Sequence, residues 1–544
     1  MHVKRWMIFF VIYAILGSAP TYSSQDKYRK IKKNQALIND VYRYIVANYV
    51  DEIDLDAFTK MSIDNMLMDL DPYTVFLERE EKSGIEMLTK GKYGGVGIQI
   101  GKRDNRLTVL SPMENSPAKR AGIISGDRII EIDGKETYEM NMEDAAKLIR
   151  GPKGTVITLT IQRSGISDLQ DYSLIREDIK LNDVFYTGML DESTGYIRLT
   201  RFSKNSSKEI EKSISELIRK NMTGMILDLR DNPGGLLSAA IDILDLFIDK
   251  NQVLVWTDGK TKRANRIYKS KSDPIVPKDI NLVVLINQGS ASASEIVSGV
   301  LQDLDRAVVI GRPSYGKGLV QTVYKIDNDR SLKMTTAKYY IPSGRLIQKD
   351  GYLPSKILAD KSNIDTSFVT SGGRSVIGGG GIVPDYHIKL EKPGPILSAC
   401  YREGLFFTFV QNNKNYWDGM PTLDDKLIII DKFEKFLKQT DIDIKMEGES
   451  NYQDMKDYFN QLDSANLSIN GAFELMDQYF EQIAATQFER EADLLHHRIL
   501  VEFAEHYSGV EGRMKYSSMK DKDILKAISI LNDPLAYKDV FLPN

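Results

Sequence analysis

Short apolar runs alternate with amphipathic segments through the middle of the chain. Three runs, GMILDLR (224–230), NLVVLIN (281–287) and RAVVIGR (306–312), are apolar at nearly every position, which is typical of strands buried on both faces. The first two lead through glycine-bearing turns into helical patterns, LLSAAIDILDLFI and ASASEIVSGVLQDL. Strands spaced by helices indicate a mainly parallel sheet with helices on both faces. We therefore predict an α/β domain over 175–390, with ligands at the carboxyl ends of its strands.

Helical and strand patterns divide the rest of the chain. Residues 27–89 have a helical pattern with one apolar face, as in INDVYRYIVANYV. Residues 90–168 change to strand patterns, such as YGGVGIQI and GTVITLTIQR, around one short amphipathic helix, NMEDAAKLIRG. This stretch has the length of one small domain. Residues 391–544 are helical and carry no motif to which chemistry can be assigned, so we interpret them as a helical accessory domain.

The N-terminal stretch has the pattern of an export signal. Lys4 and Arg5 precede the apolar run WMIFFVIYAIL (6–16), and small and polar residues follow it. The run is too short to span a bilayer comfortably, so we predict a signal peptide over 1–24 in preference to a membrane anchor; the cleavage site and a retained anchor stay open. The single cysteine, Cys400, allows no disulfide within the chain. We expect the protein in the periplasm or cell envelope of a Gram-negative bacterium.

Charge and histidine content argue against two classes of function. The formal net charge of −4 gives no electrostatic basis for binding nucleic acid. None of the five histidines has a nearby partner of the type that a zinc site needs. The adjacent His496 and His497 lie in a helical pattern and point to different faces, so we expect them at a solvated surface. We expect neither a nucleic-acid partner nor a metal site.

The segment INQGSASASEIVSGV (286–300) raises the question of a nucleophile. It places Ser290, Ser292 and Ser294 at alternate positions directly after a strand, with no histidine within eighty residues. Ser292 and Glu295 make the S-x-x-E pattern of a capping box, which would satisfy amides at the start of the following helix. The same turn would also suit a reactive serine, and spacing alone does not decide which of the three it is.

A serine on a strand-to-helix turn needs donors for an oxyanion. If Ser292 is the nucleophile, the next backbone amide, Ala293 N–H, points from the start of the helix toward the reacting carbonyl. The NPGG turn after the first strand offers the amides of Gly234 and Gly235, which a carbonyl oxygen can approach without meeting a Cβ atom. We therefore expect the two turns to form one site.

Lys317 is the candidate for the base that removes the serine proton. The segment from Gly311 to Lys317 matches the start of a phosphate-binding loop, but Gly318 stands where that loop needs serine or threonine, and a strand pattern follows. A lysine whose pKa falls from about 10.4 to about 7 or 8 on burial can instead accept the proton as a neutral amine. If 317–323 is a strand, Gln321 lies on the same side as Lys317 and can orient the amine without adding charge.

Seven sequence blocks, in this order, resemble the carboxyl-terminal processing peptidases, the tail-specific serine proteases. They are LDPYT (70–74), GYIRLTRF (195–202), DLRDNPGG (228–235), NQGSASASEI (287–296), GRPSYGKGLVQ (311–321), TTAKYYIPSGRLIQ (335–348) and GGGIVPD (379–385). The resemblance covers about residues 39–389 and implies a ClpP/crotonase-like catalytic domain of stacked βαβ units. It also implies a Ser-Lys dyad with a glutamine, at Ser292, Lys317 and Gln321, and no requirement for a cofactor.

The same resemblance identifies the small domain over 90–168 as a PDZ domain. Its loop Gly95, Val96, Gly97 and Ile98 is similar to the PDZ loop whose backbone amides hold the terminal carboxylate of a peptide. An exported serine endopeptidase that binds protein substrates by their C-termini is therefore implied. The alternative is an inactive PDZ-bearing peptide-binding protein on a peptidase scaffold. For the C-terminal helices, dimerisation, binding of an adaptor protein and shielding of the groove stay open.

Overall fold

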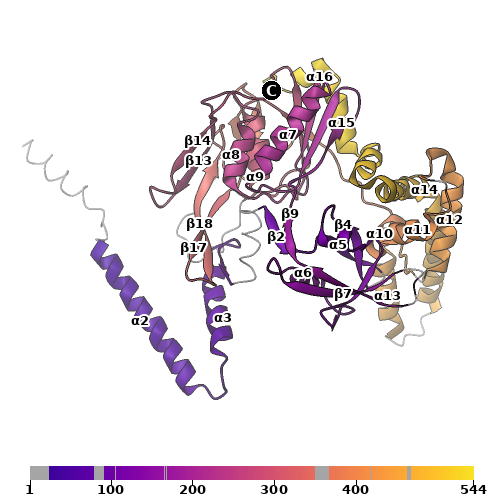
Figure 1. Cartoon of the computed structure of the whole chain (residues 1–544), viewed down its shortest axis with the longest axis horizontal. Coiled ribbons are helices and arrows are strands. Elements are labelled where there is room, and N and C mark those ends of the chain that lie inside the picture. Colours follow the sequence, from indigo (N-terminus) through magenta and orange to yellow (C-terminus); the bar gives the residue numbers. More distant parts are fainter. Residues whose placement is uncertain are drawn as a thin grey trace, which may run out of the picture. The chain divides into compact units, whose positions relative to one another are not determined.

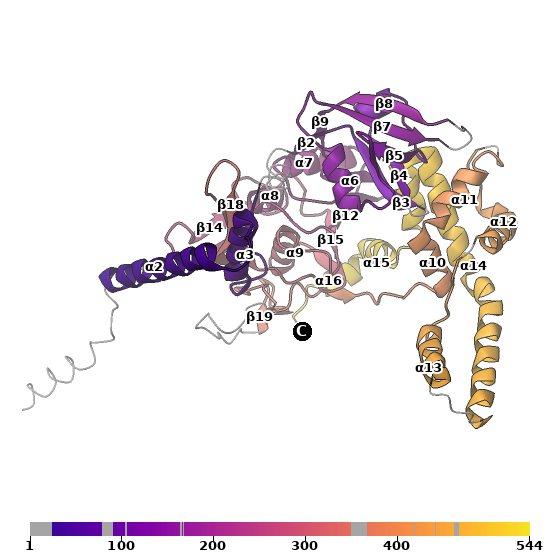
Figure 2. The same cartoon turned by 90° about the horizontal axis from the view of Figure 1, so that it is seen from below.

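The computed structural model describes residues 24–78, 91–103, 106–163, 166, 168–349, 367–417, 419–440, 442–461 and 467–543 (Figure 1 and Figure 2). The predicted signal peptide over 1–24 lies outside these residues, apart from its last position. Helices α2 (Ser24–Asn48) and α3 (Leu55–Met68) follow, as the helical pattern predicts. Within the described residues, no helix is both long enough and apolar enough to cross a membrane.

A six-stranded sheet forms the centre of the α/β domain. Its order is β10-β11-β12-β15-β16-β21, and every neighbouring pair is parallel except β10 with β11. The three apolar runs of the sequence are the adjacent strands β12, β15 and β16, so the predicted mainly parallel sheet is confirmed. The strands are β10 (Val184–Met189), β11 (Thr194–Leu199), β12 (Gly224–Asp228), β15 (Asn281–Ile286), β16 (Val308–Gly311) and β21 (Tyr386–His387).

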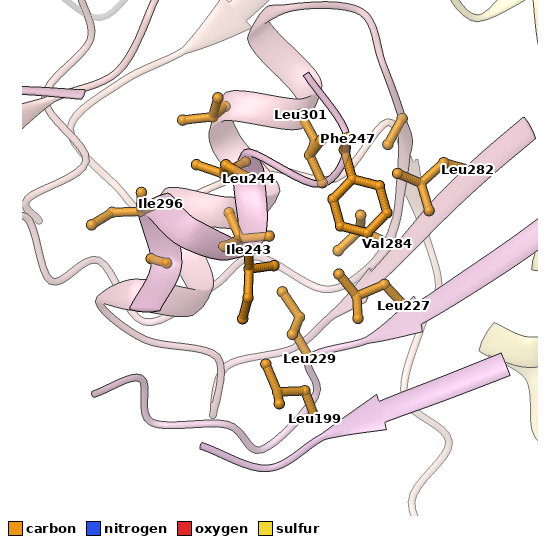
Figure 3. Close-up of a cluster of buried hydrophobic side chains, with 14 of the residues drawn as sticks. Leu199, Leu227, Leu229, Ile243, Leu244, Phe247, Leu282, Val284, Ile296 and Leu301 are labelled. Atoms are coloured by element: carbon orange, nitrogen blue, oxygen red, sulfur yellow. The ribbon is translucent and has the colours of Figure 1, made fainter. Parts of the chain in front are cut away.

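Helices cover both faces of this sheet. Alternate side chains of β12 show the division, because Leu227 packs in one core with α7, α8 and α9, whereas Ile226 packs in another with α15 and α16. Figure 3 shows the first core, in which Leu227 and Val284 of the strands lie near Ile243 and Leu244 of α8. The helices are α7 (Ser206–Arg219), α8 (Leu237–Leu244), α9 (Ala293–Asp303), α15 (Lys522–Leu531) and α16 (Pro534–Asp539). The helices that pack on the second face thus belong to the C-terminal region.

A second, antiparallel sheet adjoins the loops of the first. Strand β18 pairs with both β17 and β13, and β13 pairs with β14. A short hairpin, β19 with β20, follows later in the chain. The strands are β13 (Val253–Gly259), β14 (Arg266–Lys269), β17 (Leu319–Lys325), β18 (Ser331–Tyr340), β19 (Ser367–Val369) and β20 (Ser375–Ile377).

The small domain is a separate antiparallel sheet with its own core. The strand order is β3-β4-β5-β7-β8, and helices α5 (Pro117–Arg120) and α6 (Met142–Ile149) contribute to the core. The sheet continues past residue 168, because β8 pairs with β7 along its whole length. The antiparallel pair β2 (Lys92–Gly95) and β9 (Glu177–Lys180) joins this domain to the α/β domain. The strands of the sheet are β3 (Ile98–Arg103), β4 (Arg106–Pro112), β5 (Arg128–Ile132), β6 (Lys135–Glu136), β7 (Val156–Gln162) and β8 (Gln170–Ile175).

The C-terminal region is helical, as predicted, and has a core of its own that includes Phe409, Phe433 and Phe503. The prediction that His496 lies at a solvated surface is wrong, because the residue is only 6% exposed, whereas the neighbouring His497 is half-buried. The helices are α10 (Pro395–Glu403), α11 (Leu405–Asn413), α12 (Lys426–Gln439), α13 (Glu449–Gln461) and α14 (Leu467–Ser518), the last interrupted at Gly509.

Candidate active site

Three loops leave the carboxyl ends of the adjacent strands β12, β15 and β16. They carry the NPGG turn, the serine segment and the lysine segment, respectively. Because parallel neighbours end at one edge of the sheet, the sheet order brings these loops together. The amide of Tyr315, in the lysine loop, donates to the carbonyl of Ser290 at 3.0 Å, which joins the second loop to the third.

Burial distinguishes the three serines. Ser290 and Ser294 are fully buried, and their hydroxyls donate to main-chain carbonyls at 2.8 Å, Ser290 to Leu229 and Ser294 to Asn232. Both acceptors lie in the neighbouring loop after β12. Ser292 alone of the three is partly exposed. The structure thus assigns a structural role to two serines and leaves Ser292 accessible.

The backbone of Ser292 forms a sharp strand-to-helix turn. Ser292 is the N-cap of α9 and has φ 55° and ψ −109°, which L-residues rarely adopt. Such strain is typical of a serine that a strand-to-helix turn presents to a substrate. Ala293 follows as the first residue of the helix, where backbone amides have no partner within the helix. The turn therefore supplies a hydroxyl and an adjacent N–H donor.

Glu295 joins this turn to the lysine loop. Its carboxylate is fully buried, and one oxygen, Oε2, accepts the amides of both Ser292 (2.7 Å) and Lys317 (2.8 Å). The other oxygen accepts the Gly316 amide and the Ser314 hydroxyl, each at 2.6 Å. Burial raises the pKa of the Glu295 carboxyl, and these donors oppose that shift. A single carboxylate thus fixes the backbones of the candidate nucleophile and base relative to each other.

Tyr339 makes a second link between the same two residues. It lies on β18 and is almost completely buried. Its hydroxyl donates to the carbonyl of Lys317 at 2.5 Å and lies within 3.3 Å of the carbonyl of Ser292. The amides of Ser292 and Lys317 therefore meet at Glu295, and their carbonyls meet at Tyr339.

The NPGG turn lies directly against the serine turn. A Cβ atom on Gly234 would stand 2.6 Å from the Ala291 carbonyl oxygen and 2.9 Å from the Ala293 nitrogen, and Gly234 has φ +95°. Only glycine fits such an approach. The Gly234 amide already donates to the Asn232 side chain at 2.9 Å. Among the described residues the Gly235 amide has no acceptor, so of the two glycine amides it is the candidate donor for an oxyanion.

Comparison with known proteins gives this arrangement a family. The family model of peptidase family S41 matches residues 193–356, a PDZ domain model matches 108–163, and a model described as a probable PDZ-protease C-terminal helical domain matches 396–531. The carboxy-terminal-processing protease of Bartonella bacilliformis is 36% identical over 366 residues, which cover 65% of this chain and 82% of that protein. The chain belongs to peptidase family S41.

Further relatives of this S41 peptidase carry similar names. Carboxy-terminal processing protease CtpA of Bacillus subtilis is 34% identical over 342 residues, which cover 63% of this chain and 71% of that protein. Among solved structures, the photosystem II D1 C-terminal processing protease is 26% identical and aligns with a TM-score of 0.37 over 65% of this chain and 93% of that one. The ClpP/crotonase-like α/β class with a PDZ domain and helical flanking regions, expected from the resemblance, agrees with this family.

Lys317 of the S41 peptidase lies before a strand and not within one. Strand β17 begins at Leu319, and its register with β18 is irregular directly before Gln321. The assumed strand over 317–323 is therefore wrong at its start, and strand alternation gives no support for Gln321 lying on the side of Lys317. The Gln321 amide lies 3.3 Å from the Leu319 carbonyl and 3.4 Å from the Thr335 hydroxyl. Its role in orienting the amine stays a prediction.

The predicted carboxylate-binding loop of the PDZ domain connects β2 to β3, with Gly95 at the end of one strand and Ile98 at the start of the other. The carbonyl of Val96 accepts the Ala118 amide at 3.0 Å. The carbonyl of Gly97, which has φ +71°, accepts the Ser116 hydroxyl at 3.0 Å. The start of α5 thus fixes the carbonyls on one side of the loop.

Two residues that organise the loops of the candidate active site were not predicted to do so. Glu295 was assigned only to a capping box, and its return bond to the Ser292 amide is present, but its bonds to the lysine loop were not foreseen. Tyr339 lay within a recognised block without a role. A charged residue predicted to be buried at a helix start is the signal that could have identified Glu295, because a buried carboxylate needs several donors.

Proposed function

We propose that this S41 peptidase is a serine endopeptidase that cleaves by a Ser292–Lys317 dyad. The observation that carries the proposal is that Ser292, the partly exposed serine of the three, shares one Glu295 oxygen with Lys317 through their backbone amides. Two residues from different loops, whose backbones are joined through one carboxylate oxygen, are suited to act as nucleophile and base.

The proposed reaction follows from these positions. The neutral amine of Lys317 takes the proton from Ser292 Oγ, which attacks the scissile carbonyl carbon and forms a tetrahedral intermediate. The N–H groups of Ala293 and Gly235 donate to its oxyanion. Lys317 then protonates the leaving amine, and an acyl-enzyme remains on Ser292. Water, deprotonated by Lys317, attacks the acyl carbon and releases the product.

The test compares cleavage of an unstructured protein by the wild type and matched variants. Ser292→Ala and Lys317→Ala should each lower kcat by about 10³-fold or more. Ser298→Ala, which removes a buried hydroxyl that donates to the Ser294 carbonyl within α9, and Lys325→Ala, which removes an exposed lysine of β17, should keep far higher activity. Full activity in Ser292→Ala or Lys317→Ala would refute the dyad. A wild type that binds but never cleaves the substrate would favour the peptide-binding alternative.

We further propose that the PDZ domain selects substrates by their free C-termini. The loop Gly95, Val96, Gly97 and Ile98 would bind the terminal carboxylate through backbone amides while the peptide pairs with β3. A substrate with an amidated C-terminus should then show a lower kcat/KM than the same substrate with a free carboxylate. Equal values for the two substrates would remove tail recognition from the proposal.

We propose that the protein is exported to the periplasm or cell envelope. The support is the sequence pattern alone, in which Lys4 and Arg5 precede the apolar run over 6–16. N-terminal sequencing of the protein from fractionated cells should find a soluble form that lacks the apolar run. Recovery in the membrane fraction with the run intact would identify a retained anchor, and recovery in the cytoplasm would refute export.

A further inference from the structure

Two of the three loops of the candidate active site carry an arginine near their start. Arg230 follows β12, and Gly234 lies four residues further along; Arg312 follows β16, and Lys317 lies five residues further along. The side chains of Arg230 and Arg312 are only 10% and 15% exposed. Guanidinium groups remain charged when buried, so each needs a carboxylate nearby.

One carboxylate from the C-terminal region binds both arginines. Asp523 lies in the first turn of α15 and is 3% exposed. Its two oxygens accept the two Nη atoms of Arg312 at 3.0 and 2.8 Å, a bidentate pair. Its Oδ2 also accepts Nη1 of Arg230 at 2.9 Å. Asp523 therefore joins the bases of two catalytic loops from a position more than 200 residues later in the chain.

The two arginines depend on Asp523 to different degrees. Arg230 also pairs with Asp228 at 2.6 Å and with Asp521 at 2.9 Å. For Arg312, Asp523 is the one carboxylate partner among the described residues. Loss of the Asp523 charge would leave Arg312 buried beside another cation, so the loop that carries Lys317 would shift more than the NPGG turn.

We propose that Asp523 is a positioning residue of the peptidase, which sets the geometry of the Lys317 loop through Arg312 and of the Gly234–Gly235 turn through Arg230. The C-terminal region then completes the active site without touching the substrate. Docking of α15 on the sheet becomes a condition for activity. This inference rests on the proposed Ser292–Lys317 chemistry.

The test is Asp523→Asn, which keeps the shape of the side chain and removes its charge. The matched control is Asp533→Asn, because Asp533 also lies at the start of a C-terminal helix, but in the described part of the chain its carboxylate accepts only the amides of Leu535 and Ala536. At a temperature where both variants are folded, Asp523→Asn should lower kcat by roughly 10- to 100-fold and leave KM within about twofold. The apparent pKa of the base in the pH profile of kcat/KM should also move. Asp533→Asn should change none of these quantities.

The outcomes separate this inference from the proposed function. A folded Asp523→Asn variant with the kcat and pH profile of the control would overturn the positioning role, as would a fall in kcat that only follows the folded fraction. If Asp523→Asn does not fold, Arg312→Lys is measured in its place. This variant keeps the positive charge but loses the bidentate pair with Asp523. It should lower kcat and shift the pH profile in the same direction as Asp523→Asn, but to a smaller extent. If Ser292→Ala and Lys317→Ala are active, the proposed function fails whatever Asp523→Asn does.

Discussion

At the scale of single residues, the alternating serines have two functions that the spacing alone could not separate. Ser290 and Ser294 each donate to a carbonyl of the loop after β12, so they hold the NPGG turn against the serine turn. Ser292, between them, is partly exposed and has a strained backbone. The pattern is therefore explained by two structural hydroxyls that flank one accessible hydroxyl.

The Glu295 carboxylate gives the first prediction. Glu295→Gln should lower kcat on the order of 10²-fold, because the amide NH2 group would face N–H donors that now bind a carboxylate oxygen. The matched control is Glu209→Gln, since Glu209 also accepts two backbone amides, those of Asp183 and Val184, but lies on α7. Steady-state kinetics on an unstructured substrate would measure both variants. Equal kcat values for the two would show that the Glu295 link is not needed for catalysis.

Gly234 gives the second prediction. Gly234→Ala should abolish most activity, because its Cβ would push apart the Ala291 carbonyl and the Ala293 amide, and a displaced oxyanion donor costs about 10²- to 10³-fold in kcat. Gly448→Ala is the control: Gly448 has φ +85° but no atom within 4 Å of the added Cβ, so it isolates the backbone cost, about 1–2 kcal/mol. Thermal unfolding and kcat would be measured together. Comparable kcat values in the two variants would contradict close packing of the turns.

At the scale of elements, patterns of apolar residues predicted the strands well and their ends less well. The runs that became β12, β15 and β16 are apolar except for Asp228 at the end of β12 and Asn281 at the start of β15, and burial on both faces imposes that composition. The start of β17 was predicted two residues too early, because a side-chain contact determines where the strand begins. The Gly318 amide donates to Gln348 Oε1 at 2.9 Å instead of to a neighbouring strand. Such a contact depends on a residue thirty positions away and leaves no local pattern.

Helix α14 gives a prediction for pH dependence. Burial, aided by Lys520, lowers the pKa of His497 to about 4, so the folded state favours the neutral ring. The stability that this contributes is complete above the unfolded pKa of about 6.5 and is lost as the pH falls toward 4. Between pH 7 and pH 4.5, the Tm of the wild type should therefore fall further than that of His497→Gln. His387→Gln, at an exposed ring, should follow the wild type, and parallel curves for all three would contradict a neutral, half-buried ring at His497.

At the scale of the whole molecule, the fold class and the proximity of the three loops could be predicted, but the helices that cover the second face of the sheet could not. The C-terminal region was recognisable as helical, yet a helical pattern does not specify which surface a helix covers. Tyr537 of α16 illustrates the difficulty, because its hydroxyl bonds both the amide and the carbonyl of Leu282, 255 residues earlier. The contact of Arg312 with Asp523 spans 211 residues and is equally invisible in the sequence.

The packing of α15 on the second face of the sheet gives the last prediction. Ile524 of α15 is 1% exposed and packs in the core with Ile226 and Val283, whereas its neighbour Leu525 is 46% exposed. Ile524→Ala should cost about 2–5 kcal/mol of unfolding free energy and Leu525→Ala about 0.5 kcal/mol. Hydrogen exchange of the β12 and β15 amides should report this loss, because α15 and these strands share one core. If the C-terminal helices were an independent accessory domain, Ile524→Ala would speed exchange only within them and would leave both strands protected.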